Sequence, residues 1–130
     1  MFALDTNTVI YFFKGLGRVN ERLLGIPPSE IAIPAVVLFE LENGMAQSSS
    51  PEKRRAQLDT LLGVVTILPL DKGAAQAASR TDAALRRAGK AIGPMDTLIA
   101  GIALAHDATL VTHNISEFRR VRGLRVEDWY

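Results

Sequence analysis

Short, uninterrupted apolar runs alternate along this chain with longer segments whose apolar residues recur every three or four positions. The apolar runs predict strands, and the helical spacing predicts helices. Strands are expected at residues 2–5, 30–33, 64–68 and 109–112, with a last edge strand at 124–126. Helices are expected at 6–14, 18–24, 34–45, 51–62, 71–88 and 94–106, followed by a short helical turn at 115–120.

The strands consist of continuous apolar residues rather than alternating apolar and polar ones, which is typical of a sheet covered on both faces. Strands that alternate with helices are in turn typical of parallel sheets. We therefore predict an α/β fold, a three-layer α/β/α sandwich with a mostly parallel central sheet. No linker or internal repeat interrupts the pattern, so residues 1–130 are expected to form a single domain.

Four acidic residues interrupt the apolar segments and are the main candidates for function. Asp5 ends the first strand, and Glu117 follows the strand at 109–112. Glu40 stands inside an apolar helical run, and Asp96 opens another apolar helix. A buried carboxylate is costly unless it is paired or coordinates a metal. The four residues therefore predict one pocket that holds hard divalent cations.

The predicted topology explains why these acids should meet. Ligands of open parallel sheets bind beyond the carboxyl ends of the strands, and Asp5, Thr112 and Asn114 all lie at or just past such ends. On the helix at 34–45, Glu42 lies roughly 200° around from Glu40, so only one of the two can face the pocket. We select Glu40, because apolar residues lead into it.

Each acid also has a purely structural interpretation. Asp5 could cap the helix that follows it, and Asp96 could cap its own helix. Glu40 could pair with a buried arginine, whereas Glu117 could lie on the open surface. The pocket disappears only if all four interpretations hold together.

The amino-acid composition restricts the possible kinds of functional site and the expected cellular location. Cysteine is absent, which excludes disulfides and thiolate metal sites and fits the cytoplasm, where we expect the protein to act. The N-terminal residues carry neither a basic region nor a long apolar run, so we expect no signal peptide and no membrane span. If metal neutralises the four acids, the remaining charge is strongly positive. Basic clusters at 53–55, 86–90 and 119–125 would then suit a polyanion, unless each is an ordinary solvated helix face.

Four short sequence blocks, in the order in which they occur, are the most specific motifs of this chain. They are Leu-Asp-Thr-Asn at 4–7, Glu-Leu-Glu-Asn-Gly at 40–44, Gly-Pro-Met-Asp-Thr-Leu-Ile-Ala at 93–100, and Leu-Val-Thr-His-Asn at 110–114, which continues to Gly-Leu-Arg-Val-Glu-Asp-Trp at 123–129. In these blocks the chain resembles the PIN-domain ribonucleases, and most closely the VapC-type toxins of bacterial toxin–antitoxin pairs. The resemblance spans nearly the whole chain.

The resemblance implies a PIN-like fold and an endoribonuclease that depends on Mg²⁺ or Mn²⁺ and leaves a 5′-phosphate. Matched by motif, Asp5, Glu40 and Asp96 would form the acidic metal site, and Glu117 and Asn114 would complete it. Many relatives carry an aspartate where Asn114 stands, and a neutral amide oxygen would hold a second metal more weakly.

Hydrogen bonds from neighbouring side chains hold the ligands of most metal sites in place. We expect Asn7 and Thr112 to make such bonds to the acids of this site.

Partners and target also follow from the resemblance. It implies a small antitoxin that wraps the toxin, a homodimer that forms a hetero-oligomer with the antitoxin, and promoter DNA bound only through the antitoxin. RNA would be the substrate, with tRNA the expected target and inhibition of translation the result. Apolar residues of the early helices are candidate contacts for the antitoxin, namely Val9, Ile10, Leu23 and Leu24.

Other interpretations compete with an active nuclease. Phosphatases that form an aspartyl-phosphate need a second aspartate where Asn7 stands, and receiver-like proteins need a lysine that residues 109–114 lack. A catalytically inactive PIN-like module that binds RNA or a partner is the stronger alternative, although four intact acids argue against it. His106 is expected to cap a helix and His113 to lie in an exposed loop.

Overall fold

The sheet of this protein is wholly parallel. In the structure, a computed structural model that describes residues 1–130, five strands lie in the order β3-β2-β1-β4-β5. The strands are β1 (Phe2–Leu4), β2 (Ile31–Pro34), β3 (Thr66–Leu68), β4 (Thr109–Val111) and β5 (Val126–Glu127). The predicted α/β fold is thus confirmed, and each expected strand is present.

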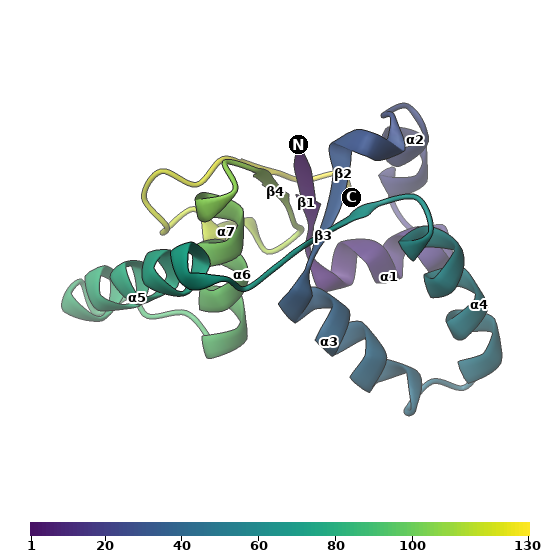
Figure 1. Cartoon of the computed structure of the whole chain (residues 1–130), viewed down its shortest axis with the longest axis horizontal. Helices are drawn as coiled ribbons and strands as arrows, with labels where there is room; N and C mark the ends of the chain where they lie inside the picture. Colours follow the sequence, from purple (N-terminus) through teal and green to yellow (C-terminus); the bar gives the residue numbers. More distant parts are fainter.

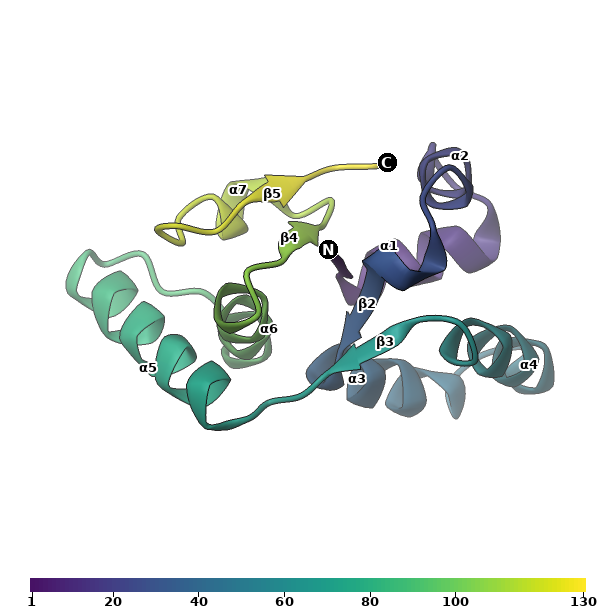
Figure 2. The same ribbon diagram turned by 45° about the horizontal axis from the view of Figure 1, so that its top comes forward.

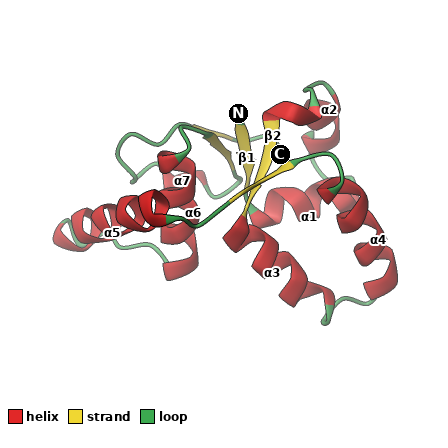
Figure 3. Cartoon of the chain, viewed as in Figure 1, coloured by secondary structure: helices red, strands yellow, loops and turns green.

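Helices cover both faces of this sheet (Figures 1 and 3). They are α1 (Thr6–Lys14), α2 (Val19–Leu24), α3 (Ala35–Met45), α4 (Pro51–Leu62), α5 (Lys72–Arg87), α6 (Pro94–Ala105) and α7 (Ile115–Phe118), with a 3₁₀ turn at Pro28–Glu30. Figure 2 shows α5, α6 and α7 on one side of the strands and α1, α2 and α4 on the other. This division follows from right-handed crossovers, because the chain moves one way across the sheet up to β3 and then returns to β4 on the opposite side of β1.

The register brings several chain segments to one edge. Leu4 of β1 pairs with Val111 of β4, so the residues after both strands emerge side by side. The Asp5 N–H group donates to the Val111 carbonyl oxygen at 2.9 Å, which extends the ladder by one bond. The carboxyl edge of the sheet is therefore where the first and fourth strands deliver their polar residues.

Close packing of α5 on α6 fixes the helix that carries Asp96. A Cβ atom at Gly101 would lie 2.5 Å from the Ala78 Cβ and 2.7 Å from the Ala74 carbonyl oxygen. Only glycine therefore allows the two helices to approach this closely. Both alanines are buried, so the contact belongs to the core.

The C-terminal residues close over the α1–α2 turn. Trp129 is buried, and its ring lies 5.2 Å from that of Phe2. The Arg18 N–H group donates to the Tyr130 carbonyl oxygen at 2.9 Å. Gly17 has a φ of +62°, and a Cβ there would lie 2.6 Å from the same oxygen. The chain end thus has a fixed place in the fold.

The structure also corrects some expectations. Pro34 is the last residue of β2 rather than the first of the next helix, because its backbone is extended and it pairs with Leu68. Val9 and Leu23 are buried in the core, so they offer no contact surface. Leu24, which is 78% exposed, does. No helix is both long enough and apolar enough to cross a membrane.

Candidate active site

Asp5 follows β1 and caps α1, and it is buried. Its Oδ1 accepts from the Thr6 N–H group at 2.8 Å, and its Oδ2 accepts from the Thr112 hydroxyl at 2.7 Å. Burial raises the pKa of Asp5, the two hydrogen bonds oppose that rise, and nearby Glu40 adds to it. The capping interpretation is therefore correct but incomplete, because each oxygen keeps a lone pair for a further partner.

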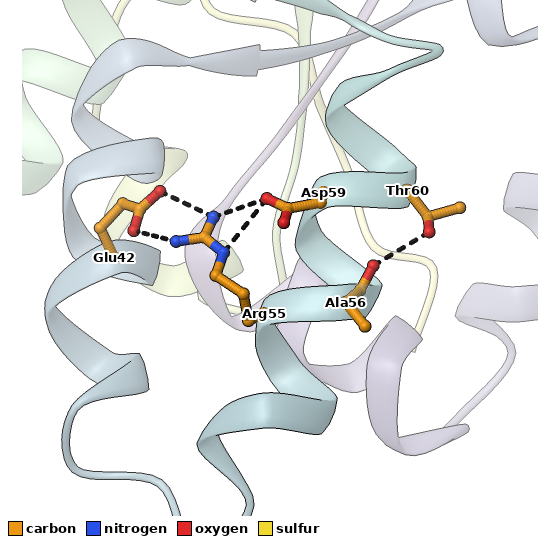
Figure 4. A network of polar contacts seen from close by, with 5 residues as sticks. All are labelled: Glu42, Arg55, Ala56, Asp59 and Thr60. Atoms are coloured by element: carbon orange, nitrogen blue, oxygen red, sulfur yellow. Dashed lines mark hydrogen bonds and ion pairs between the residues drawn. The ribbon is translucent and has the colours of Figure 1, made fainter.

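Glu40 lies on α3 and bonds to Thr6, next to Asp5 in the chain, rather than to an arginine. Its Oε1 accepts from the Thr6 hydroxyl at 2.7 Å. Two residues along the same helix, Glu42 forms two hydrogen bonds to Arg55 of α4, at 2.7 and 3.0 Å (Figure 4). The two acids of α3 thus face different partners, as the helical angle between them requires.

Asp96 shows that the acids share one region. Burial raises the pKa of Asp96 to about 6, helped by the charges of Asp5, Glu117 and Glu40 and by a hydrogen bond with Glu117. Its helix begins at Pro94, after the cap residue Gly93, and no side chain caps that end. A role as a helix cap alone does not account for Asp96.

A chain of hydrogen bonds joins Glu117 to Asp5. The Asn114 Nδ2 donates to the Glu117 Oε2 at 3.1 Å, and the Asn114 backbone N–H donates to the Thr112 hydroxyl oxygen at 3.0 Å. That hydroxyl in turn donates to Asp5. Thr112 is fully buried, so it links the two acids through the interior.

Asn7 is the one candidate that the structure does not bring into this network. Its side chain is exposed on α1, whereas the preceding Thr6 supplies the hydrogen bond to Glu40. The sequence contained a signal for Thr6, because a residue next to a capping Asp5 must lie at the sheet edge. It could not show that the hydroxyl reaches α3.

The atoms of the site that could bind a metal are all oxygens, which are the ligands that Mg²⁺ and Mn²⁺ prefer. As the side chains stand, no three acidic or histidine residues converge closely enough to hold a metal ion. The chemistry nevertheless fits a divalent cation, because a positive charge would relieve the repulsion that raises the pKa of Asp96. Three of the acids are only half-buried, whereas Asp5 is buried.

The two histidines lie where the sequence placed them. His106 is the C-terminal cap residue of α6. His113 is exposed, its Nδ1 lies 2.9 Å from the Asp128 Oδ2, and its ring stacks on Tyr130 at 4.4 Å. His113 adjoins Asn114 of the hydrogen-bonded chain, but neither histidine bonds to an acid of the site.

A cavity of about 340 Å³ adjoins the acidic cluster between α1, α3 and α4. Glu40 lines it together with Lys14 and Arg54. Arg54 also donates to the Phe13 carbonyl oxygen at 3.5 Å, which ties α4 to α1. The cavity therefore opens beside one acid of the cluster and carries both signs of charge.

Comparison with known proteins decides the family, since the model of the PIN domain matches residues 2–124. The chain belongs to the PIN-domain family. Within that PIN-domain family it is 35% identical over 128 residues to a "tRNA(fMet)-specific endonuclease VapC" from Shigella flexneri, covering 98% of this chain and 97% of the relative.

Solved structures of PIN-domain proteins agree. VapBC2 from Rickettsia felis, bound to a fragment of its promoter DNA, matches with a TM-score of 0.91 and 33% identity over 99% of this chain and 98% of that one. DNA-bound VapBC from Salmonella typhimurium matches with a TM-score of 0.90 and 35% identity, also over 99% and 98%. The resemblance to VapC proteins that the sequence predicted is confirmed.

Proposed function

We propose that this protein is the toxin of a toxin–antitoxin pair, an endoribonuclease that depends on Mg²⁺ or Mn²⁺ and inhibits translation by cutting RNA, with tRNA as the target. The observation that carries the proposal is the group of acids at one edge of the sheet, where hydrogen bonds join Asp5 through Thr112 and Asn114 to Glu117. The charges of these acids also help to raise the pKa of Asp96 to about 6. Relatives named as ribonucleases, one of them specific for tRNA, support the nuclease and its substrate.

In this proposal Asp5 and Asp96 would be the principal metal ligands. Glu40 and Glu117 would bind the metal or orient water beside it, and Asn114 would contribute a neutral oxygen. When bound, the metal lowers the pKa of water and clamps phosphate oxygens, which is the chemistry that phosphodiester hydrolysis needs. Water adds to phosphorus, and the 3′ oxygen leaves with a proton, so the products carry a 5′-phosphate and a 3′-hydroxyl.

The threonines of the site act on the acids rather than on the RNA. Thr112 and Thr6 donate to Asp5 and Glu40, respectively. The same bonds fix the direction of each carboxylate. Both hydroxyls therefore keep the carboxylates oriented for a cation.

The proposal extends to the assembly. The antitoxin covers the cavity beside Glu40, and its basic side chain reaches the acids across Leu41 and Ile10, which line the same cavity. Solved relatives are toxin–antitoxin complexes on DNA, which supports an antitoxin partner and promoter DNA bound by the complex. We further propose a homodimer, one domain over 1–130, and action in the cytoplasm.

Cleavage of total tRNA by purified protein tests the function. We expect discrete fragments with Mg²⁺ or Mn²⁺, none with EDTA, and a loss of at least a hundredfold in the Asp96→Asn variant. Glu42→Gln is the matched control, because Glu42 lies on α3 but pairs with Arg55, and it should keep wild-type activity.

Cleavage that persists in EDTA would contradict metal dependence. No cleavage under any metal by folded protein free of antitoxin, on tRNA or on total RNA, would favour the inactive RNA- or partner-binding module.

A further inference from the structure

Four basic side chains surround a second, larger hollow on the other side of the sheet. It has a volume of about 940 Å³ and lies between α5, the end of α6 and the segment after α7. Arg80, Lys90, Arg120 and Arg122 line it, and we call this group the basic hollow. No aspartate or glutamate is among its lining residues. The hollow therefore carries positive charge only.

These cations differ from the arginines that pair with acids elsewhere in the chain. Each of those arginines lies within 3.1 Å of an acid, so its charge is balanced; they are Arg22, Arg55, Arg86 and Arg125. The same pairings correct the expectation that whole basic clusters form a rim. None of the four residues of the basic hollow makes a salt bridge, although all four are exposed. Like charges gathered without acids repel one another, and an anion relieves that repulsion.

The basic hollow borders the acidic site. Arg120 follows Glu117 by one turn, and its N–H donates to the Glu117 carbonyl oxygen at 3.0 Å. Its guanidinium donates to the carbonyl oxygens of Lys90 and Ala91 at 3.4 and 3.5 Å, just before the helix that carries Asp96. On α6 the first lining residue of the hollow, Leu104, lies about 12 Å beyond Asp96, at 1.5 Å per residue. An RNA that contacts both the acids and this end of the hollow must therefore extend well past the acids.

We propose that the basic hollow binds phosphates of the RNA strand beyond the scissile bond. The inference rests on the proposed function, since it assigns an extended RNA to the same site. Charge complementarity carries it, because phosphate is the recurring charge of RNA and the hollow offers several uncompensated cations. No aromatic side chain lines the hollow, so it contacts the backbone and adds affinity and position rather than base recognition.

Binding of tRNA tests the proposal without catalysis. Arg80→Gln and Arg122→Gln are combined in an Asp96→Asn background, and affinity is measured in EDTA over a range of salt concentrations. Arg120 is left unchanged, because its guanidinium donates hydrogen bonds to backbone carbonyl oxygens and its loss could disturb the fold. We expect affinity to fall about tenfold and the slope of log K against log salt to shrink by roughly 0.7 per lost contact.

Arg87→Gln is the matched control. Arg87 lies on α5 like Arg80 and is likewise exposed, but it does not line the hollow. It should bind tRNA as the parent does. Equal affinity and salt slope in the control and in the double variant would overturn the inference, and so would a loss of antitoxin binding with RNA binding unchanged, which would assign the hollow to an acidic segment of that partner.

Cleavage then separates this inference from the proposed function. The ratio of kcat/KM on tRNA to kcat/KM on a short oligonucleotide spanning the cut bond should fall about tenfold in the active double variant, mainly through KM. An unchanged ratio would contradict RNA binding at the basic hollow but would leave the proposed nuclease activity intact. If the wild-type protein cleaves no RNA, the proposed nuclease activity is wrong, and the binding measurement still tests whether the basic hollow binds RNA.

Discussion

Asp96 is the residue at which burial and repulsion are most visible. Its folded pKa of about 6 lies above the ordinary value of 3.8, so the folded protein holds this proton more tightly than the unfolded chain does. Stability from this group is therefore present below pH 4 and is lost as the pH rises through 6. After solvent screening of a half-exposed group, the loss is on the order of 1 kcal/mol.

Asp96→Asn should remove that loss. In EDTA we expect the variant to unfold about 2 to 5 °C above wild type at pH 7, and at nearly the same temperature as wild type at pH 4. Thermal unfolding followed by circular dichroism at the two pH values measures the difference. A variant less stable than wild type at pH 7 would show that Asp96 makes favourable contacts outweighing the repulsion.

Thr112 should matter for stability as well as for the site. Thr112→Val removes the buried hydroxyl that donates to Asp5 and accepts from the Asn114 N–H, which leaves a buried carboxylate short of a donor. We expect a loss of about 1.5 to 3 kcal/mol in the free energy of unfolding, measured by urea titration. Thr60→Val is the control, because that exposed hydroxyl only bonds to the Ala56 carbonyl oxygen of its own helix (Figure 4). A loss equal to that of the control would refute the role of Thr112.

At the scale of elements, the close packing of α5 on α6 can be tested by substitution of Gly101. Gly101→Ala places a Cβ against the Ala74 carbonyl oxygen, which cannot turn aside as a flexible side chain would. We expect a net loss of about 1 to 3 kcal/mol in stability, although alanine favours helices. Gly44→Ala on α3 meets nothing within 4 Å and should instead stabilise the protein slightly. Chemical denaturation of both variants decides, and equal effects would contradict close packing.

The elements themselves were largely predictable because their signals are local. Apolar runs and helical spacing fix the strands and helices, and Gly15, which adopts a left-handed conformation, ends α1 where the sequence predicts. Predicted boundaries of elements are wrong where two local signals compete, as at Pro34, which suits both the end of a strand and the first turn of a helix. The prediction that Val9 is a contact residue is wrong, because its burial depends on which face of α1 meets the sheet.

Side-chain partners were less predictable than elements. The grouping of Asp5 with Asp96 follows from the order of the elements, since strand ends and helix starts meet at one edge. It could not pair Arg55 with Glu42, because these residues belong to different helices whose packing is a tertiary property. For the same reason, the sequence could not show which residues of the basic clusters pair with acids and which remain unpaired.

At the scale of the whole molecule, two charged regions lie side by side. Acids collect where β1 and β4 end, and uncompensated cations collect beyond α7 and along α5. Arg120 lies between them, one turn after Glu117. The net charge of +1 hides this separation. If both proposals hold, the metal ligands lie at one end of the RNA path and the phosphate contacts at the other.

The fixed chain end decides where this protein tolerates an extension. Tyr130 lies against Gly17 and stacks on His113, one residue from Asn114. Met1 instead precedes β1, at the amino edge of the sheet, and is 46% exposed. A fusion partner or affinity tag joined after Tyr130 would crowd the approach of RNA and antitoxin, whereas one joined before Met1 would trail away from both.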